Sequence, residues 1–264
     1  MRAFFISALC LLSTLCASML SAQTNEAQAT FAGTQAEWHG FTLFTDQGRK
    51  VVLPKKAAPG NPWVLRARFW GHEPQFDIAM LNKGYHLVYC NISGLFGNPE
   101  AVSRWDAFYT ELTEKHGFSR KVVLEGFSRG GLIVYNWARA NTGQVAAIYG
   151  DAAVMDMKSW PGVSHAGMRR AYKFETEEEA RAFAGNPIDH LEPLAKAGIP
   201  IIHVVGDADD TVPVSENTAI AQKRYRDMGG VFEVIHKPGC RHHPHSLKDP
   251  APLVAFMEKY VESK

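Results

Sequence analysis

The chain has 264 residues, 46% of them hydrophobic, and its 28 Lys and Arg nearly balance its 27 Asp and Glu, for a formal net charge of +1. This length and composition predict one globular domain with a full hydrophobic core. The balanced charge, without a basic block or an acidic tail, excludes the classes of protein whose function depends on binding nucleic acid or an anionic membrane.

Residues 1–22 have the pattern of a secretory signal peptide. Arg2 forms a short positive start, and an apolar stretch from Ala3 to Leu20 is followed by small residues. Because this stretch is near the lower length limit for a spanning helix and is interrupted by Ser and Thr, we expect cleavage and no membrane anchor. The sequence thus predicts a secreted or periplasmic protein with a flexible lead at 23–36 and a folded domain at 37–264.

Beyond the lead, predicted strands and helices alternate along the chain. Two apolar segments flank Asp46-Gln47-Gly48 and predict a hairpin, and Pro, Asn and Gly residues mark the helix ends. The predicted strands are 41–44, 50–53, 63–70, 85–90, 122–124, 145–149, 201–205 and 231–236. The predicted helices are 74–83, 99–116, 132–138, 187–198, 215–228 and 252–261.

This alternation predicts an α/β fold with a mostly parallel central sheet and helices on both faces. The leading hairpin adds an antiparallel N-terminal edge. Residues 152–185 interrupt the pattern with Pro161, several glycines and the segment Thr176-Glu177-Glu178-Glu179, whose spacing is typical of a capping box. We expect a small cap there, or an excursion over the sheet edge.

The segment Gly126-Phe127-Ser128-Arg129-Gly130 lies between the predicted strand 122–124 and the predicted helix 132–138. A bare G-x-S-x-G match is weak, but strand, turn and helix together predict a nucleophile elbow. The turn forces its central residue into a strained conformation and exposes the hydroxyl at the sheet edge, and the glycines let neighbouring backbone pass closely. Ser128 is therefore the predicted nucleophile.

A serine hydroxyl needs a base, and the base needs a carboxylate that orients it. Both are expected at the carboxyl ends of later strands, where ligands bind in open α/β sheets. An acidic turn follows the strand 201–205, and a histidine-rich segment follows the strand 231–236. The resulting order of Ser, Asp and His along the chain is that of the α/β hydrolases.

On these motifs the chain resembles α/β-hydrolase-fold serine hydrolases over roughly residues 38–260, and it is similar to their prolyl-oligopeptidase-like and carbohydrate-esterase branches. In those relatives the acid lies in a Gly-x-x-Asp-x-x-Val-Pro turn. That frame fits Gly206 and Val212-Pro213, so the resemblance selects Asp209. Asp151, after the strand 145–149, is the alternative acid. Asp207 and Asp210 are interpreted as neighbours of the acid, since Asp also stabilises turns.

The relatives place their base after a Gly-x-Gly-type turn, which here reads Gly239-Cys240-Arg241. This position selects His242. Because Arg241 departs from the pattern, His243 and His245 stay open as alternatives. The histidines could instead ligate zinc, but no Cys, Glu or His set at metal spacing accompanies them. We expect no metal and no cofactor.

The resemblance also implies an oxyanion hole with two backbone N–H donors. One belongs to Arg129, the residue after the nucleophile. The other lies after the third strand of the fold, where the match is Trp70. Because Trp70 departs from the family's usual residue, only the backbone role carries over, and its ring could line the pocket or pack in the core.

Two side chains are predicted to contact the substrate. An Arg129 guanidinium suits a carboxylate or another polar oxygen ligand, although a salt bridge to a nearby Asp or Glu would also explain it. Trp160, in the interrupting segment 152–185, is the second candidate.

The combined prediction is a secreted serine hydrolase that cleaves carboxylic esters through an acyl-enzyme, with a polar, carbohydrate-linked or other small-molecule ester as substrate. One alternative is a serine peptidase of the prolyl-oligopeptidase-like type, although those relatives usually carry a propeller domain for which this chain is too short. The other is a non-catalytic glycan-binding protein on the same fold. The sequence leaves the acyl group, the alcohol and the oligomeric state open.

Overall fold

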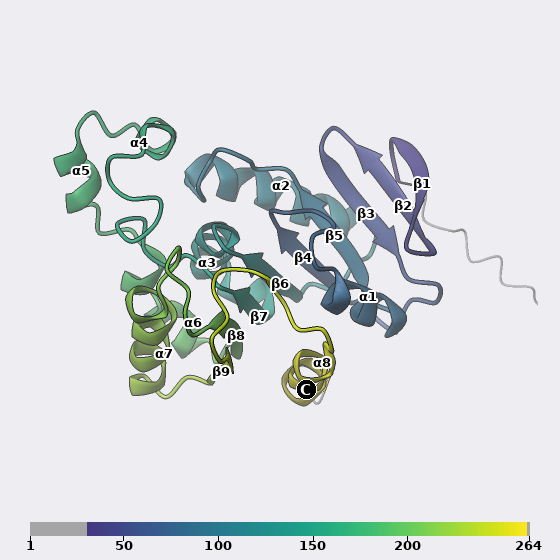
Figure 1. The fold of residues 1–264 in the computed structure, drawn as a ribbon. Helices are drawn as coiled ribbons and strands as arrows, with labels where there is room; N and C mark the ends of the chain where they lie inside the picture. The colour runs from purple at the N-terminus through teal and green to yellow at the C-terminus, as the bar shows by residue number, and fades with distance from the viewer. Residues whose placement is uncertain (1–30, 263–264) are drawn as a thin grey trace, which may run out of the picture. The chain divides into compact units, whose positions relative to one another are not determined.

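The computed structural model describes residues 31–262, in which a sheet of nine strands has the order β1-β2-β3-β5-β4-β6-β7-β8-β9 (Figure 1). Strands β4 to β9 run parallel, whereas β1, β2 and β3 pair antiparallel with their neighbours. This confirms the predicted sheet and its antiparallel N-terminal edge. The strands are β1 Thr34–Trp38, β2 Phe41–Asp46, β3 Arg49–Leu53, β4 Trp63–Ala67, β5 His86–Cys90, β6 Val122–Phe127, β7 Val145–Asp151, β8 Ile201–Gly206 and β9 Phe232–Lys237.

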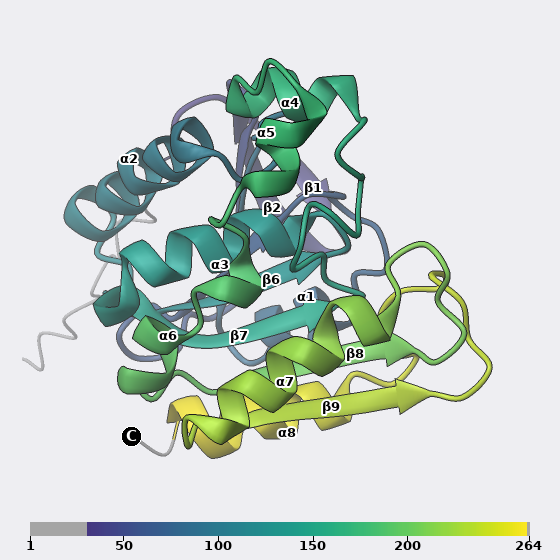
Figure 2. The ribbon, with the colours of Figure 1, turned by 90° about the vertical axis from the view of Figure 1, so that its left-hand side faces the viewer.

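Helices cover both faces of the sheet, with α2, α3, α6 and α7 on one face and α1 and α8 on the other (Figure 2). The helices are α1 Gln75–Asn82, α2 Pro99–Lys115, α3 Gly130–Ala140, α4 Ala166–Tyr172, α5 Glu177–Ala182, α6 Glu192–Lys196, α7 Thr218–Asp227 and α8 Ala251–Met257. Short 3-10 turns occupy Thr142–Gln144, Pro187–Asp189 and Val214–Glu216, and a π-turn occupies Glu258–Glu262.

Each central strand supplies side chains to two separate apolar cores. On β4, Leu65 packs in the core beneath α2 and α3, whereas Val64 packs in the core beneath α1 and α8. Leu124 and Val123 divide in the same way on β6. Because successive side chains of a strand point to opposite faces, a strand covered on both faces needs apolar residues throughout. This requirement explains the continuous apolar runs in the sequence.

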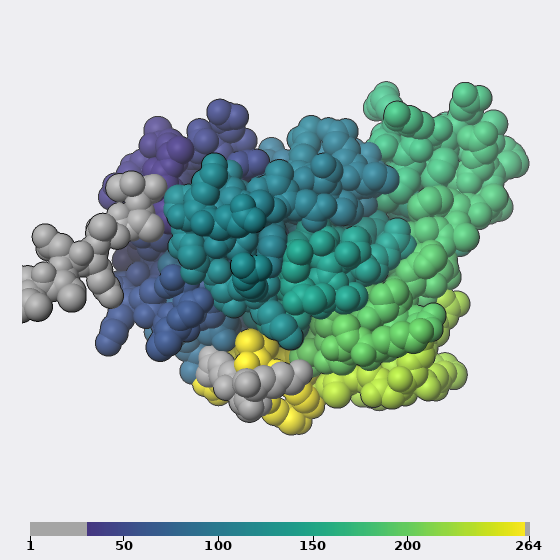
Figure 3. All heavy atoms as spheres, turned by 180° about the vertical axis from the view of Figure 1, so that it is seen from behind, coloured from purple at the N-terminus to yellow at the C-terminus, as the bar shows by residue number. Residues whose placement is uncertain are grey.

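Residues 152–185 form the predicted excursion, which carries α4 and α5 and projects at one end of the described domain (Figure 3). Its rings form a small third core, in which Tyr172 packs against Phe174 and Phe183 at centroid distances of 5.5 and 5.3 Å. The Thr176 hydroxyl accepts the N–H of Glu179 at 3.2 Å, so this side chain caps α5 as the sequence predicted.

Strand β1 was not predicted, because Thr34–Trp38 overlaps the end of the predicted lead at 23–36. Four of its five side chains are exposed, so no alternation of apolar and polar residues marks it. The predicted signal peptide, residues 1–22, lies outside the described residues. Within residues 31–262, no helix has the length and apolar character needed to cross a lipid bilayer.

Two other predicted elements differ in extent. The predicted helix 187–198 is divided into a 3-10 turn and α6, because Pro193 has no N–H to bond the carbonyl four residues earlier and its ring would clash there. The predicted strand 63–70 ends at Ala67, where Arg68 and Phe69 turn the chain with φ angles of 67° and 47°.

Candidate active site

Ser128 lies in the sharp turn between β6 and α3, with a left-handed φ of 48°. This conformation is strained for a residue with a Cβ, and hydrogen bonds from the surrounding chain hold it. The Ser128 N–H donates to the carbonyl of Asp151 at 2.8 Å. The Ser128 carbonyl accepts the N–H groups of Gly131 and Val154 at 3.0 and 2.9 Å. The predicted elbow is therefore present, and it is fixed to the end of β7.

The glycines of the elbow are required by close approach of other backbone. A Cβ at Gly126 would lie 2.8 Å from the Val134 side chain and 3.0 Å from the Gly130 carbonyl oxygen. A Cβ at Gly130 would lie 2.7 Å from the carbonyl oxygen of Ala67. Side chains at these positions would push α3 away from β6 and β4, and so displace Ser128.

The structure brings Ser128, His242 and Asp209 together at the carboxyl ends of the strands. His242 Nε2 lies 3.0 Å from Ser128 Oγ, and His242 Nδ1 lies 2.7 Å from Asp209 Oδ2. The other Asp209 carboxylate oxygen accepts the N–H groups of Thr211 and Val212, each at 2.9 Å. These donors orient the carboxylate so that it holds the Nδ1–H of His242, which leaves Nε2 free to accept the serine proton.

The neighbouring acidic residues have other partners. Asp207 Oδ1 lies 2.6 Å from His236 Nδ1. Asp210 forms an ion pair with Arg241, the residue that replaces the second glycine of the family's turn. Neither carboxylate bonds to His242, as the Val-Pro frame of the turn predicts.

The structure gives the alternative acid, Asp151, and the alternative bases, His243 and His245, other surroundings. Asp151 Oδ1 lies 2.7 Å from His245 Nδ1, and Asp151 Oδ2 accepts the Ser246 N–H at 2.7 Å. His245 therefore belongs to a second, buried Asp–His pair. His243 is exposed, and its ring makes no hydrogen bond to another described residue. Among residues 31–262, His242 is thus the histidine that reaches Ser128.

Three histidines gather beside this site. One ring nitrogen each of His72, His243 and His245 lies within 4.8 Å of the other two. His72 comes from the loop after β4, so sequence spacing could not show this group. Ligands held at about 2.0–2.1 Å by one Zn²⁺ are at most about 4.2 Å apart, so the rings would have to move closer to bind it. The expectation of no bound metal remains a prediction.

Trp70 packs in an aromatic cluster. Its ring centroid lies 5.1 Å from that of Trp38 and 5.5 Å from that of Tyr89, and the Lys50 ammonium lies 5.6 Å from its ring. Of the two interpretations of the ring, packing is therefore the one the structure supports. The oxyanion role of its backbone N–H remains a prediction.

A buried arginine holds the loop that contains Trp70. Arg66 is 1% exposed, pairs with Asp77 and with Glu125 at 3.2 Å, and donates to the carbonyls of Phe69, at 3.1 Å, and His72. Burial raises the pKa of Glu125 well above its usual range, although Arg66 opposes the shift. Arg66 was not predicted, since a charged residue inside a strand carries no pattern.

The Arg129 side chain makes no ion pair or hydrogen bond with residues 31–262, which leaves the predicted salt bridge without a partner there. Its guanidinium lies 5.6 Å from the Phe69 ring centroid, and the guanidinium of Arg68 lies 5.2 Å from the same point. Partial burial lowers the pKa of both groups, and the Arg129 charge lowers that of Arg68 further. Arg68 was also not predicted from the sequence.

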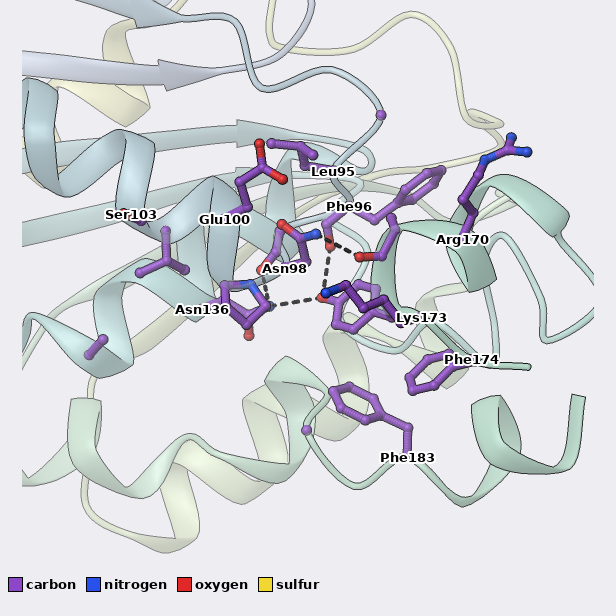
Figure 4. A pocket seen from close by; sticks show the side chains of 18 of the residues that line it. Leu95, Phe96, Asn98, Glu100, Ser103, Asn136, Arg170, Lys173, Phe174 and Phe183 are labelled. Carbon is purple, nitrogen blue, oxygen red and sulfur yellow. Dashed lines mark hydrogen bonds between the residues drawn. The ribbon is translucent and has the colours of Figure 1, made fainter. Parts of the chain in front are cut away.

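A large cavity of about 1220 Å³ is lined by none of the three residues Ser128, His242 and Asp209. It lies between the segment 94–100, the end of α3 and the excursion. There the ring centroids of Phe174 and Phe183 are 5.3 Å apart, with the rings tilted by 56° (Figure 4). We place the active site at Ser128, because the reactive groups gather there. Trp160 packs on Phe96 within the third core, and its substrate contact remains a prediction.

A mostly parallel sheet with a Ser–His–Asp relay at its strand ends defines the α/β-hydrolase class of serine hydrolases. The model of the prolyl oligopeptidase family matches residues 107–264, which is more than half of the chain. The chain therefore belongs to the prolyl oligopeptidase family. None of the curated proteins compared with the chain matches it.

Two solved structures illustrate the likeness in fold. The acylaminoacyl peptidase of Pyrococcus horikoshii is 13% identical with a TM-score of 0.62, and the match covers 89% of this chain and 42% of that one. The puromycin-hydrolyzing peptidase of Mycobacterium tuberculosis is 15% identical with a TM-score of 0.60, and the match covers 84% of this chain and 37% of that one. The chain spans less than half of the length of either structure. At such identities the likeness establishes the fold.

Proposed function

We propose that the chain is a serine peptidase of the prolyl-oligopeptidase type, which cleaves an amide bond through an acyl-enzyme. The observation that carries the proposal is the Asp209–His242–Ser128 relay, at 2.7 and 3.0 Å, in a member of this family. The names of the two structural neighbours describe peptidases. Family membership thus favours the peptidase, which the sequence offered as an alternative, over the ester hydrolase.

In the proposed mechanism, Ser128 Oγ attacks the scissile carbonyl while His242 Nε2 takes its proton. Asp209 holds His242 in the required tautomer and stabilises the imidazolium. The backbone N–H groups of Arg129 and Trp70 stabilise the oxyanion, a role in which each donor is typically worth about 10²–10³ in rate. His242 then donates the proton to the leaving amine, and a water molecule activated by the same imidazole releases the acyl group.

A fluorophosphonate probe tests the nucleophile. The wild type and the control Ser93→Ala, which changes an exposed serine, should be labelled, and Ser128→Ala should not. Equal labelling of Ser128→Ala and wild type would show that another residue reacts. The wild type should also cleave aminoacyl and dipeptidyl anilides, and turnover of aryl esters alone would contradict the peptidase.

The second candidate is a hydrolase of a polar or carbohydrate-linked carboxylic ester. The observation that favours it is Arg129, the residue after the nucleophile, whose guanidinium has no acidic partner among residues 31–262 and suits an oxygen-rich ester. Hydrolysis of such esters with no cleavage of anilides would select it. Glycan binding without probe labelling or turnover would instead select the non-catalytic alternative.

We also propose that the protein acts outside the cytoplasm after removal of residues 1–22. The apolar stretch from Ala3 to Leu20 and the small residues after it support this proposal. N-terminal sequencing of the protein exported by an expressing cell should begin at Gln23. A mature protein that retains Met1 would refute it.

A further inference from the structure

We propose that Arg68 and Arg129 form an anion-binding subsite beside Ser128, which takes a carboxylate carried by the substrate. This inference rests on the proposed hydrolase function, and it holds for either an amide or an ester substrate. It adds the chemical class of the substrate, and it assigns a role to Arg68, which no sequence motif marked.

Arg68 and Arg129 both line one small hollow of about 10 Å³. Arg68 comes from the turn after β4 and Arg129 from the elbow, and both guanidinium carbons lie within 6 Å of the Phe69 ring centroid. The rest of the hollow is lined by apolar side chains and glycines, namely Ile92, Gly94, Phe96, Gly97 and Ile133. The lining thus contains two cations and, among the described residues, no carboxylate.

Five arginines of residues 31–262 are paired with acids. Carboxylates of Glu111, Asp77, Glu100, Asp189 and Asp210 neutralise Arg49, Arg66, Arg104, Arg224 and Arg241 respectively. The half-buried Arg139 and Arg169 lack an acid but donate to the carbonyls of Gly185 and Glu175. By contrast, the partly buried side chains of Arg68 and Arg129 make neither an ion pair nor a hydrogen bond within the described chain. The Arg68 Nε atom is buried and has no hydrogen-bond partner there. Two like charges held together in a low-dielectric hollow repel each other, and an anionic ligand would remove that repulsion.

The backbone that presents Arg68 is strained. Arg68 and Phe69 are consecutive left-handed residues, and each carries a side chain that this conformation disfavours. The buried Arg66 holds the turn by donating a hydrogen bond to the Phe69 carbonyl at 3.1 Å. Strain that is maintained by a buried network is typical of binding and catalytic sites.

The size and position of the hollow select the ligand. About 10 Å³ is near the lower limit for one water molecule, so at most one oxygen of a carboxylate enters the hollow and the rest of the ligand lies at its mouth. A guanidinium fork matches the two oxygens of a carboxylate, and the apolar lining strengthens that interaction. Because Arg129 directly follows Ser128 in the chain, we infer that the carboxylate belongs to the part of the substrate next to the scissile bond.

The test compares matched acids and amides. The probes are the anilides of glutamate and glutamine, and the aryl monoesters of glutaric acid and of its monoamide. The wild type should prefer the acid of the productive pair by about 10- to 100-fold in kcat/KM, as expected for charge-assisted hydrogen bonds. High salt should reduce this ratio, because it screens partly exposed charges.

Arg68→Gln and Arg129→Gln should each abolish the preference for the acid, and Arg68→Lys should retain part of it. The acid-to-amide ratio is the readout, so a general loss of activity does not affect it. Arg104→Gln, which removes an exposed arginine, is the control and should keep the ratio of the wild type.

Equal turnover of acid and amide by wild type, or an unchanged ratio in both glutamine variants, would overturn the subsite. These results are distinguishable from failure of the proposed function. In that case the wild type would react neither with the fluorophosphonate nor with any substrate of the panel.

Discussion

Replacing Gly206 by alanine should move the base away from the nucleophile. Gly206 ends β8, beside the segment that leads into His242. A Cβ there would lie 2.2 Å from the Arg241 carbonyl oxygen and 2.5 Å from that of Cys240, whereas ordinary van der Waals contact begins at 3.4 Å. The φ angle of Gly206 lies outside the left-handed region, so alanine fits the local backbone and the effect is steric.

The size of the effect follows from these distances. The Arg241 carbonyl must retreat by roughly 1 Å to restore normal contact, and the next residue is His242. A shift of that size would lengthen the 3.0 Å contact between His242 Nε2 and Ser128 Oγ beyond hydrogen-bond range. A misplacement of about 1 Å in a catalytic group costs about 10²-fold in rate, and overpacking costs about 1–3 kcal/mol in stability.

The assay is kcat/KM on the best substrate of the panel, together with the rate of fluorophosphonate labelling and a thermal unfolding curve. Gly143→Ala is the matched control, because no heavy atom lies within 4 Å of a Cβ at that position. We expect an approximately 10²-fold loss for Gly206→Ala in a folded protein and no change for the control. Full activity of a folded Gly206→Ala would refute the argument that this contact fixes the position of the base.

Three other substitutions test the site and its support. Asp209→Asn should lower kcat by about 10⁴-fold, because an amide favours the wrong tautomer of the base. Its labelling by the fluorophosphonate should be slower than that of the wild type. Burial lowers the pKa of His203 to about 3, below the value of 6.5 in the unfolded chain. The free energy of unfolding is therefore unaffected by this group above pH 6.5, and it falls by about 1.4 kcal/mol per pH unit below that value. Urea unfolding at pH 7 and pH 5 should show a smaller loss of stability for His203→Gln than for the wild type. Burial raises the pKa of Glu125, so wild-type stability falls as pH rises above about 4.5, and Glu125→Gln should lack this fall. An unchanged pH slope in either variant would assign that dependence to other groups.

The relay was predictable because each of its members follows an apolar strand. Ser128, Asp209 and His242 come after the runs that form β6, β8 and β9, and parallel strands bring such positions to one edge of the sheet. Their contacts therefore follow from the order of elements along the chain. The same reasoning predicted the sheet and its antiparallel edge.

The supporting residues were not predictable, since their partners come from distant segments. Arg66 lies within a strand, and its acids come from α1 and β6. Arg68 has meaning only beside Arg129, which lies some sixty residues away in the sequence. The packing of Trp70 depends on Trp38 of β1, a strand whose exposed side chains give no periodic signal.

Asp151 accepts hydrogen bonds from the turn that carries the nucleophile and from the segment that carries the base. Its carbonyl accepts the Ser128 N–H, and its carboxylate holds His245 and the Ser246 N–H, three and four residues beyond His242. The nucleophile turn and the base segment therefore share one buried anchor, and the excursion begins just after it. A protein engineer could graft a different excursion between Val154, whose N–H also bonds the Ser128 carbonyl, and α6. Such a graft would alter the walls of the large cavity and retain the alignment of the reacting groups.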